Sequence, residues 1–142
     1  MTTIRRDVGT MRLWSRLMPG VPEALATLRE AGLVLVVVSN SDGTVERQLE
    51  QLALRPLLDA VVDSAVVGAE KPDPAIFRHA LERVGLRPER TLHVGDLYAV
   101  DVVGARRAGL HALLLDPFDD WSDDVDCPRS PDVLALARGL LD

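Results

Sequence analysis

Two aspartates stand where a parallel sheet could place them for phosphate chemistry. Residues 91–95 form a short, largely apolar run that ends in Gly95; Asp96 follows at once, and Asp101 comes five residues later. Open α/β sheets bind ligands beyond the carboxyl ends of their strands. Two carboxylates held there would suit Mg²⁺, which prefers oxygen ligands, together with a phosphate. Alternatively, Asp96 only forms a turn and Asp101 only favours the start of a helix.

Two other loops carry polar residues that suit a phosphate. Ser39 and Asn40 follow the apolar run 33–38, and a hydroxyl, an amide and backbone N–H groups at a helix start can hold phosphoryl oxygens. Ser39 could equally be only an N-cap. Lys71 stands just before a predicted helix N-terminus, where the helix dipole disfavours a cation. We therefore expect Lys71 to serve a bound anion, the alternative being a solvated loop residue.

The elements that must position these residues alternate between helices and strands. A helix is expected from Pro22 to Gly32, and the β-branched run 33–38 is typical of a strand covered on both faces. Further strands are expected at 60–63, 91–95 and 110–115, each after a helix, and a last helix follows Ser130 and Pro131. This order predicts an α/β fold with a doubly wound parallel sheet and right-handed crossovers.

Composition limits the classes of function. The 142 residues fit one domain, and 47% apolar with only 4% aromatic residues predicts an aliphatic core. A net charge of −6 argues against nucleic acid as a partner. The longest apolar run, residues 33–38, is far shorter than the ~20 residues of a membrane span, and no signal peptide is evident. The single cysteine, Cys127, excludes an intrachain disulfide, and we expect a cytoplasmic protein.

Taken together, these segments resemble the haloacid dehalogenase (HAD) superfamily. The resemblance covers roughly residues 19–117 and rests on Val-Ser39-Asn-Ser-Asp-Gly, Glu-Lys71-Pro-Asp-Pro-Ala-Ile-Phe and His-Val-Gly95-Asp96 with Asp101. It implies that Ser39 and Asn40 bind the phosphoryl group and that Lys71 neutralises charge between nucleophile and phosphate. It also implies that Asp96 binds Mg²⁺ and that Asp101 does so directly or through water.

The family's first motif, an apolar strand followed by Asp-x-Asp, is not evident in this sequence. Its first aspartate is the family's nucleophile and its second the general acid/base. Asp7-Val-Gly-Thr10 has one carboxylate and no apolar strand before it, and Asp124-Val-Asp126 stands at the wrong end of the chain. The resemblance therefore predicts a sheet that is incomplete at its central first strand.

A missing central strand would have structural consequences. The strands ending at Ser39 and Gly95 would pair directly, or take a strand from a partner or from the N-terminus, because unpaired interior edges invite strand exchange. We expect a homo-oligomer or an exchanged segment. We expect four segments in the chain: residues 1–20, a remnant of a cap or linker; residues 21–118, the α/β core; residues 119–129, an acidic loop; and residues 130–142, a C-terminal helix.

The functional expectation is a Mg²⁺-dependent phosphohydrolase that acts on a small phosphorylated metabolite through an aspartyl-phosphate. Without the first motif, this chain is expected to be inactive alone. The alternative is a non-catalytic HAD-like binding or assembly domain. A response-regulator-like domain is disfavoured because no acidic pair follows the first strand.

Overall fold

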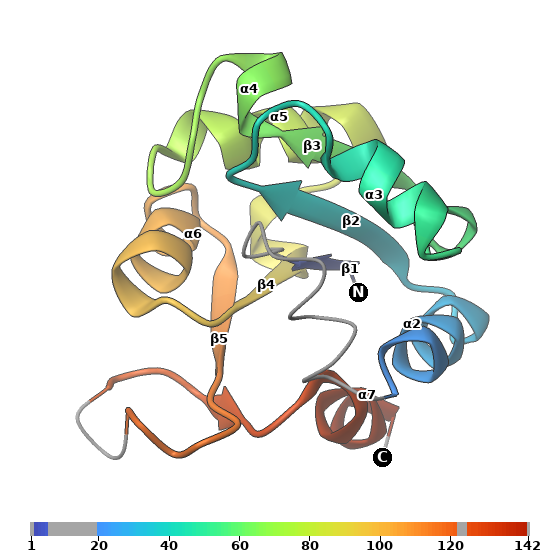
Figure 1. The fold of residues 1–142 in the computed structure, drawn as a ribbon. Coiled ribbons are helices and arrows are strands. Elements are labelled where there is room, and N and C mark those ends of the chain that lie inside the picture. Colours follow the sequence, from blue (N-terminus) through green and yellow to red (C-terminus); the bar gives the residue numbers. More distant parts are fainter. Residues whose placement is uncertain (1, 6–19, 122–124, 142) are drawn as a thin grey trace.

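The computed structural model describes residues 2–5, 20–121 and 125–141, the side chains of residues 2–5 and 141 excepted. Within these ranges the protein is an α/β domain built on one parallel sheet (Figure 1). The sheet has six strands, in the spatial order β3 (Ala60–Asp63), β2 (Val34–Ser39), β1 (Thr2–Arg5), β4 (Thr91–Gly95), β5 (His111–Leu115) and β6 (Arg129–Ser130). The predicted fold class is confirmed.

Helices cover both faces of the sheet. They are α2 (Val21–Glu30), α3 (Val45–Gln51), α4 (Ser64–Val67), α5 (Pro74–Val84), α6 (Val103–Arg107) and α7 (Val133–Leu141), with short helical turns η1 (Arg55–Leu57), η2 (Pro88–Arg90) and η3 (Tyr98–Val102). Leu35 and Val37 of β2 pack in the cluster that includes α2, α3 and α7, and Val36 and Val38 in the cluster that includes α5 and α6. Strand β2 is thus buried on both faces, as its continuous apolar run predicts.

The central strand of the sheet comes from the N-terminus of this same chain. Thr2–Arg5 runs parallel to β2 on one side and to β4 on the other, with Ile4 opposite both Val36 and His93. The prediction of a sheet incomplete at its first strand is therefore wrong, and residues 2–5 belong to the core rather than to a cap or linker remnant. No local pattern of apolar residues marks residues 2–5 as a strand. Backbone hydrogen bonds to a neighbouring strand on each side hold them in the extended conformation.

Because β1 pairs with both neighbours, the interior edges that suggested oligomerisation do not exist among the described strands. The other predicted strands and helices form within one or two residues of the expected positions. None of the helices in the described ranges combines the length and apolar character needed to cross a bilayer.

We expect Ile4→Pro to disrupt the fold, because proline removes an N–H from a central strand and cannot be accommodated there. The loss should be at least about 2 kcal/mol in the free energy of unfolding, or complete failure to fold. Urea unfolding followed by circular dichroism measures it. Ile4→Val is the matched control, since it keeps the N–H and should cost at most about 1.5 kcal/mol. Equal stability of the two variants would contradict the central position of β1.

Candidate functional site

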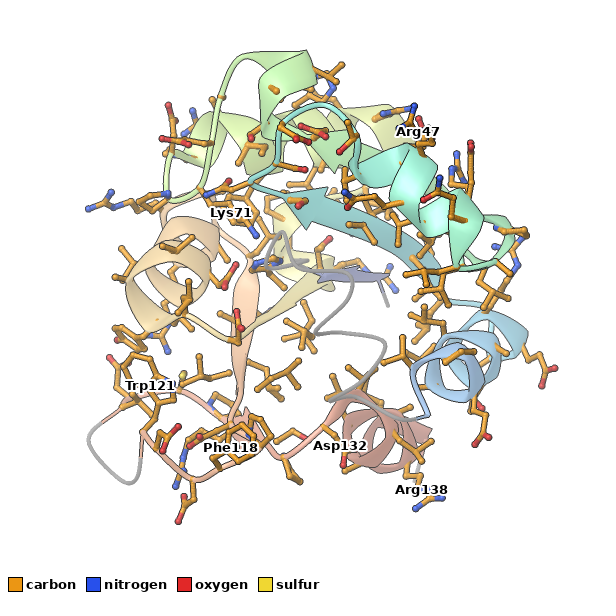
Figure 2. The ribbon with its side chains drawn as sticks, in the orientation of Figure 1. Arg47, Lys71, Phe118, Trp121, Asp132 and Arg138 are labelled. Atoms are coloured by element: carbon orange, nitrogen blue, oxygen red, sulfur yellow. The ribbon has the colours of Figure 1, made fainter. Side chains whose placement is uncertain are left out.

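Lys71 lies inside the protein, beside the end of β2 (Figure 2). Its side chain is 0% exposed. The ammonium group donates a hydrogen bond to the carbonyl oxygen of Val38 at 2.8 Å and another to Oδ1 of Asp101 at 3.0 Å. These contacts exclude the alternative of a solvated loop lysine. They place a positive charge at the carboxyl edge of the sheet, next to Ser39.

Asp101 is the buried counter-ion of Lys71. Its Oδ1 accepts the lysine hydrogen bond and also lies 3.0 Å from Nε2 of His93, while Oδ2 accepts from the backbone N–H of Leu97 at 3.1 Å. The Asp101 side chain is 0% exposed. Both carboxylate oxygens therefore face protein donors, and binding of Mg²⁺ by Asp101, directly or through water, stays a prediction. The structure makes it the residue that holds Lys71.

Gly95 provides the space that Asp101 occupies. A Cβ atom at this position would lie 2.2 Å from Cγ of Asp101, far inside van der Waals contact. The π-helical turn η3 starts at Tyr98, two residues after Asp96, and carries Asp101 back over the end of β4. Only glycine lets the strand end and the returning carboxylate approach this closely. Gly95 is thus needed for packing at this strand end.

Asn40 joins the first polar loop to the second. Its Oδ1 accepts from the backbone N–H of Lys71 at 2.8 Å, and its Nδ2 donates to the carbonyl of Lys71 at 3.0 Å. Ser39, the last residue of β2, is fully buried between these contacts and the Val38 carbonyl that holds the ammonium. The structure therefore brings Ser39, Asn40, Lys71 and Asp101 together, and gives Asn40 the role of positioning Lys71.

Two residues that the sequence did not single out shape the loop after Ser39. Asp63, at the end of β3, accepts hydrogen bonds from the backbone N–H groups of Gly43 and Val45 at 2.9 and 3.3 Å. Ser64 Oγ accepts from the N–H of Ser41 and donates to its carbonyl. Asp63 is the last residue of a predicted strand, but its partners lie about twenty residues away in sequence.

Asp96 is half-buried at the same edge of the sheet, between Gly95 and Leu97, both of which adjoin the Asp101 carboxylate. In the described ranges, no three His, Cys, Asp or Glu side chains converge on one metal-sized site. Mg²⁺ is commonly held by one or two carboxylates, with water and substrate phosphate completing its ligands. A half-buried carboxylate at a strand end fits that donor set, so Asp96 could hold Mg²⁺ and polarise a bound phosphate.

His93 is a third residue whose role sequence reasoning missed. The sequence indicated only a histidine within a strand, yet its ring is 0% exposed and reaches Asp101. Phe77 of α5 packs edge-on against it, with ring centroids 4.8 Å apart and planes at 78°. His93 and Asp101 are eight residues apart, on either side of a strand end and a turn. This spacing matches neither the helix nor the strand period, so no sequence pattern would have paired the two side chains.

The acidic loop is tied to the core at two points in its described part. Asp126 accepts hydrogen bonds from the hydroxyl of Tyr98 and from Arg106, and these two contacts lower the pKa of the Asp126 carboxyl. At the base of the loop, burial acts to raise the pKa of Asp116. The hydrogen bonds from Arg129 and from the N–H groups of Asp120 and Trp121 outweigh burial and lower it. Tyr98 thus links this loop to the turn that carries Asp101.

Comparison with known proteins identifies the family. The family model described as haloacid dehalogenase-like hydrolase matches residues 2–109, which include β1, both polar loops and the Gly95–Asp101 segment. The chain belongs to the haloacid dehalogenase-like hydrolase family.

Relatives of this HAD-family chain include named phosphatases. It is 42% identical over 100 residues to haloacid dehalogenase-like hydrolase domain-containing protein 3 of Mus musculus, covering 70% of this chain and 40% of that protein. It is 39% identical over 103 residues to the glyceraldehyde 3-phosphate phosphatase of Methanothermobacter thermautotrophicus, covering 70% and 45%. The chain spans about half the length of the curated relatives it matches, or somewhat less.

Solved structures agree with the HAD assignment. A HAD phosphatase from Thermococcus onnurineus superposes with a TM-score of 0.81 at 26% identity, covering 94% of this chain and 65% of that one. The HAD-hydrolase YfnB of Bacillus subtilis, solved bound to magnesium, superposes with a TM-score of 0.77 at 25% identity, covering 87% and 55%. The chain is thus a HAD-like hydrolase core whose named relatives include phosphatases.

We expect Gly95→Ala to destabilise the HAD core by about 1–3 kcal/mol, because the added methyl group must displace the Asp101 carboxylate or the strand end. Chemical denaturation measures the change. Gly139→Ala in α7 is the matched control: a methyl group there would meet no neighbouring atom within 4 Å, and alanine should stabilise the helix by about 0.5–1 kcal/mol. Similar effects at both glycines would contradict the close approach at Gly95.

Asp116→Asn should destabilise the protein at pH 7, because a charge-assisted hydrogen bond to Arg129 is lost. The folded-state pKa of Asp116 is below its ordinary value. Its carboxylate therefore stabilises the fold above the unfolded-state pKa, and this contribution is lost as pH falls through the folded-state pKa. Thermal unfolding of both proteins from neutral to acidic pH should show the two converging. A difference that persists unchanged in acid would contradict this role.

Proposed function

We propose that this chain is the catalytic core of a Mg²⁺-dependent phosphatase that hydrolyses a small phosphomonoester through an aspartyl-phosphate. The observation that carries the proposal is the register of β1. Thr2 lies opposite Val34 and Thr91, and Arg5 opposite Val37 and Val94. In the sequence, Asp7 comes two positions after Arg5, the last residue of this central strand. Asp7 itself lies outside the described residues.

This register changes the interpretation of Asp7-Val-Gly-Thr10. The sequence alone disfavours this segment as a first motif, because no strand is expected before it. The chain was expected to be inactive because it would then lack the first motif. With β1 between β2 and β4, Asp7 is the second residue beyond a central strand. We therefore propose that Asp7 is the nucleophile and that the chain is an active phosphatase. Asp124-Val-Asp126 falls partly outside the described residues, and Asp126 is bonded to Tyr98 and Arg106.

The proposed reaction has two displacement steps. A carboxylate oxygen of Asp7 attacks phosphorus, the bond to the ester oxygen breaks, and the leaving alkoxide takes a proton from solvent. Water then attacks the same phosphorus and the bond to Asp7 breaks, which regenerates the carboxylate and releases inorganic phosphate and a proton. Lys71 offsets negative charge at the phosphoryl group, and the Ser39 hydroxyl donates to one of its oxygens. When bound by Asp96 and Asp7, Mg²⁺ would neutralise further charge on the phosphate.

The chain departs from the family pattern at one position. Gly9 stands where the family has its second carboxylate, the proposed general acid. Substrates whose leaving group is already a weak base, such as aryl phosphates, should react faster than alkyl phosphates for this reason. The same departure is the feature that favours the alternative, a HAD-like domain that binds phosphate without turning it over.

The natural substrate is proposed to be a small phosphorylated metabolite, as in the relative named for glyceraldehyde 3-phosphate. No nucleic acid or membrane partner is proposed for a chain of net charge −6. A cytoplasmic location stays a prediction. So does a homo-oligomer, although the unpaired strands that suggested it are absent from the described sheet.

An aryl phosphate tests the proposal. We expect the unaltered chain to release the phenol in Mg²⁺ and to lose activity in EDTA. Asp7→Asn and Asp96→Asn should each lower kcat by at least about 100-fold, because each removes a charge that the reaction needs. Asp73→Asn is the control, since Asp73 is an exposed N-cap of α5. Phosphate binding without turnover would favour the non-catalytic alternative, and full activity of Asp7→Asn would exclude Asp7 as nucleophile.

A further inference from the structure

His93 occupies a position that packing alone does not explain. It is a polar ring in the middle of the sheet, 0% exposed, on a strand whose other core positions are apolar or small. Burying an imidazole is costly unless its nitrogen atoms find partners. Its Nε2 lies 3.0 Å from Oδ1 of Asp101, the same oxygen that accepts the Lys71 ammonium hydrogen bond at 3.0 Å.

The chemistry of that oxygen fixes which way the hydrogen bond runs. A carboxylate only accepts, so Nε2 of His93 must carry the proton and donate. Nε2 of His93 is therefore the donor, and the edge-on contact of the ring with Phe77 helps to hold the ring plane.

Three donors then fix the Asp101 carboxylate. Lys71 and His93 both donate to Oδ1, and the N–H of Leu97 donates to Oδ2. If the His93 donor is lost, the carboxylate can rotate about its Cβ–Cγ bond, and the Lys71 ammonium moves with Oδ1. The positive charge of Lys71 would remain at the site, but the position of its ammonium group would change.

We propose that His93 is a positioning residue: by donating its Nε2 proton to Asp101 it fixes the ammonium group of Lys71 for phosphoryl transfer. This inference rests on the proposed phosphatase function. It concerns a histidine that touches neither phosphate nor metal and acts through two other side chains. His93 therefore affects alignment rather than charge.

Substitutions that differ only in the donor test the role. His93→Leu removes the donor and keeps an apolar side chain, whereas His93→Gln restores an N–H near the position of Nε2. We expect His93→Leu to lower kcat for an aryl phosphate by about 100-fold, the scale of a misplaced group, with KM changed by no more than about threefold. His93→Gln should recover most of that loss. Ile76→Val, a buried change in the neighbouring cluster, should leave kcat unchanged.

Nitrogen-15 NMR of the unaltered chain tests the geometry without any activity. The chain has three histidines, so spectra of His79→Gln and His111→Gln assign the third. We expect Nε2 of His93 to carry the proton near neutral pH. A proton on Nδ1 alone would overturn the proposal even if neither His93 variant folded. Equal kcat for folded His93→Leu and the parent would also overturn it.

The two proposals fail separately. A parent chain that neither hydrolyses nor binds phosphate would end the phosphatase proposal. The positioning of Lys71 would then be read from its Nζ resonance, which should shift in His93→Leu and return in His93→Gln. An Nζ resonance unchanged in both variants would overturn the role of His93 whatever the activity.

Discussion

The backbone pairing of β1 with both β2 and β4 is the constraint on which the site depends. Parallel strands end at a common edge, and each strand is displaced from the next by about 4.8 Å. With β1 between them, the ends of β2 and β4 lie two such spacings apart. Ser39, at the end of β2, and Asp96, directly after β4, therefore lie on opposite sides of β1. Direct pairing of β2 with β4 would halve the distance between the two strand ends.

A buried ion pair then supplies the charge. Taking an ammonium group out of water is strongly unfavourable, and a carboxylate in contact offsets that cost only when both groups are also hydrogen-bonded. Lys71 and Asp101 meet that condition, with Val38, Leu97 and His93 providing the remaining contacts. The pair is neutral as a whole, so it can be buried, while the ammonium group still stands at the edge where a phosphate would bind.

Several polar side chains at this edge bind backbone groups of neighbouring loops. Asn40 pins the backbone of Lys71, Asp63 caps the loop after Ser39, and Ser64 binds Ser41 in both directions. Such contacts hold the polar loops in place before any substrate arrives, which lowers the entropy that binding must overcome. In a sequence, polar residues of these types look like candidate ligands, and only the structure shows which of them also bind the backbone.

The sequence by itself determined the α/β class, most of the helix and strand order, and the family, but not β1, α4 or β6. The apolar run 33–38, the Gly-Asp turn at Gly95 and the lysine before a helix are local patterns, and local patterns follow from periodicity and turn chemistry. Tertiary structure alone decided where β1 goes, because Thr2–Arg5 has no apolar pattern and is a strand only through its two neighbours. It also decided that Asp101 holds Lys71 and that His93 reaches Asp101, since these contacts join side chains eight to thirty residues apart and depend on how the chain folds back over β4.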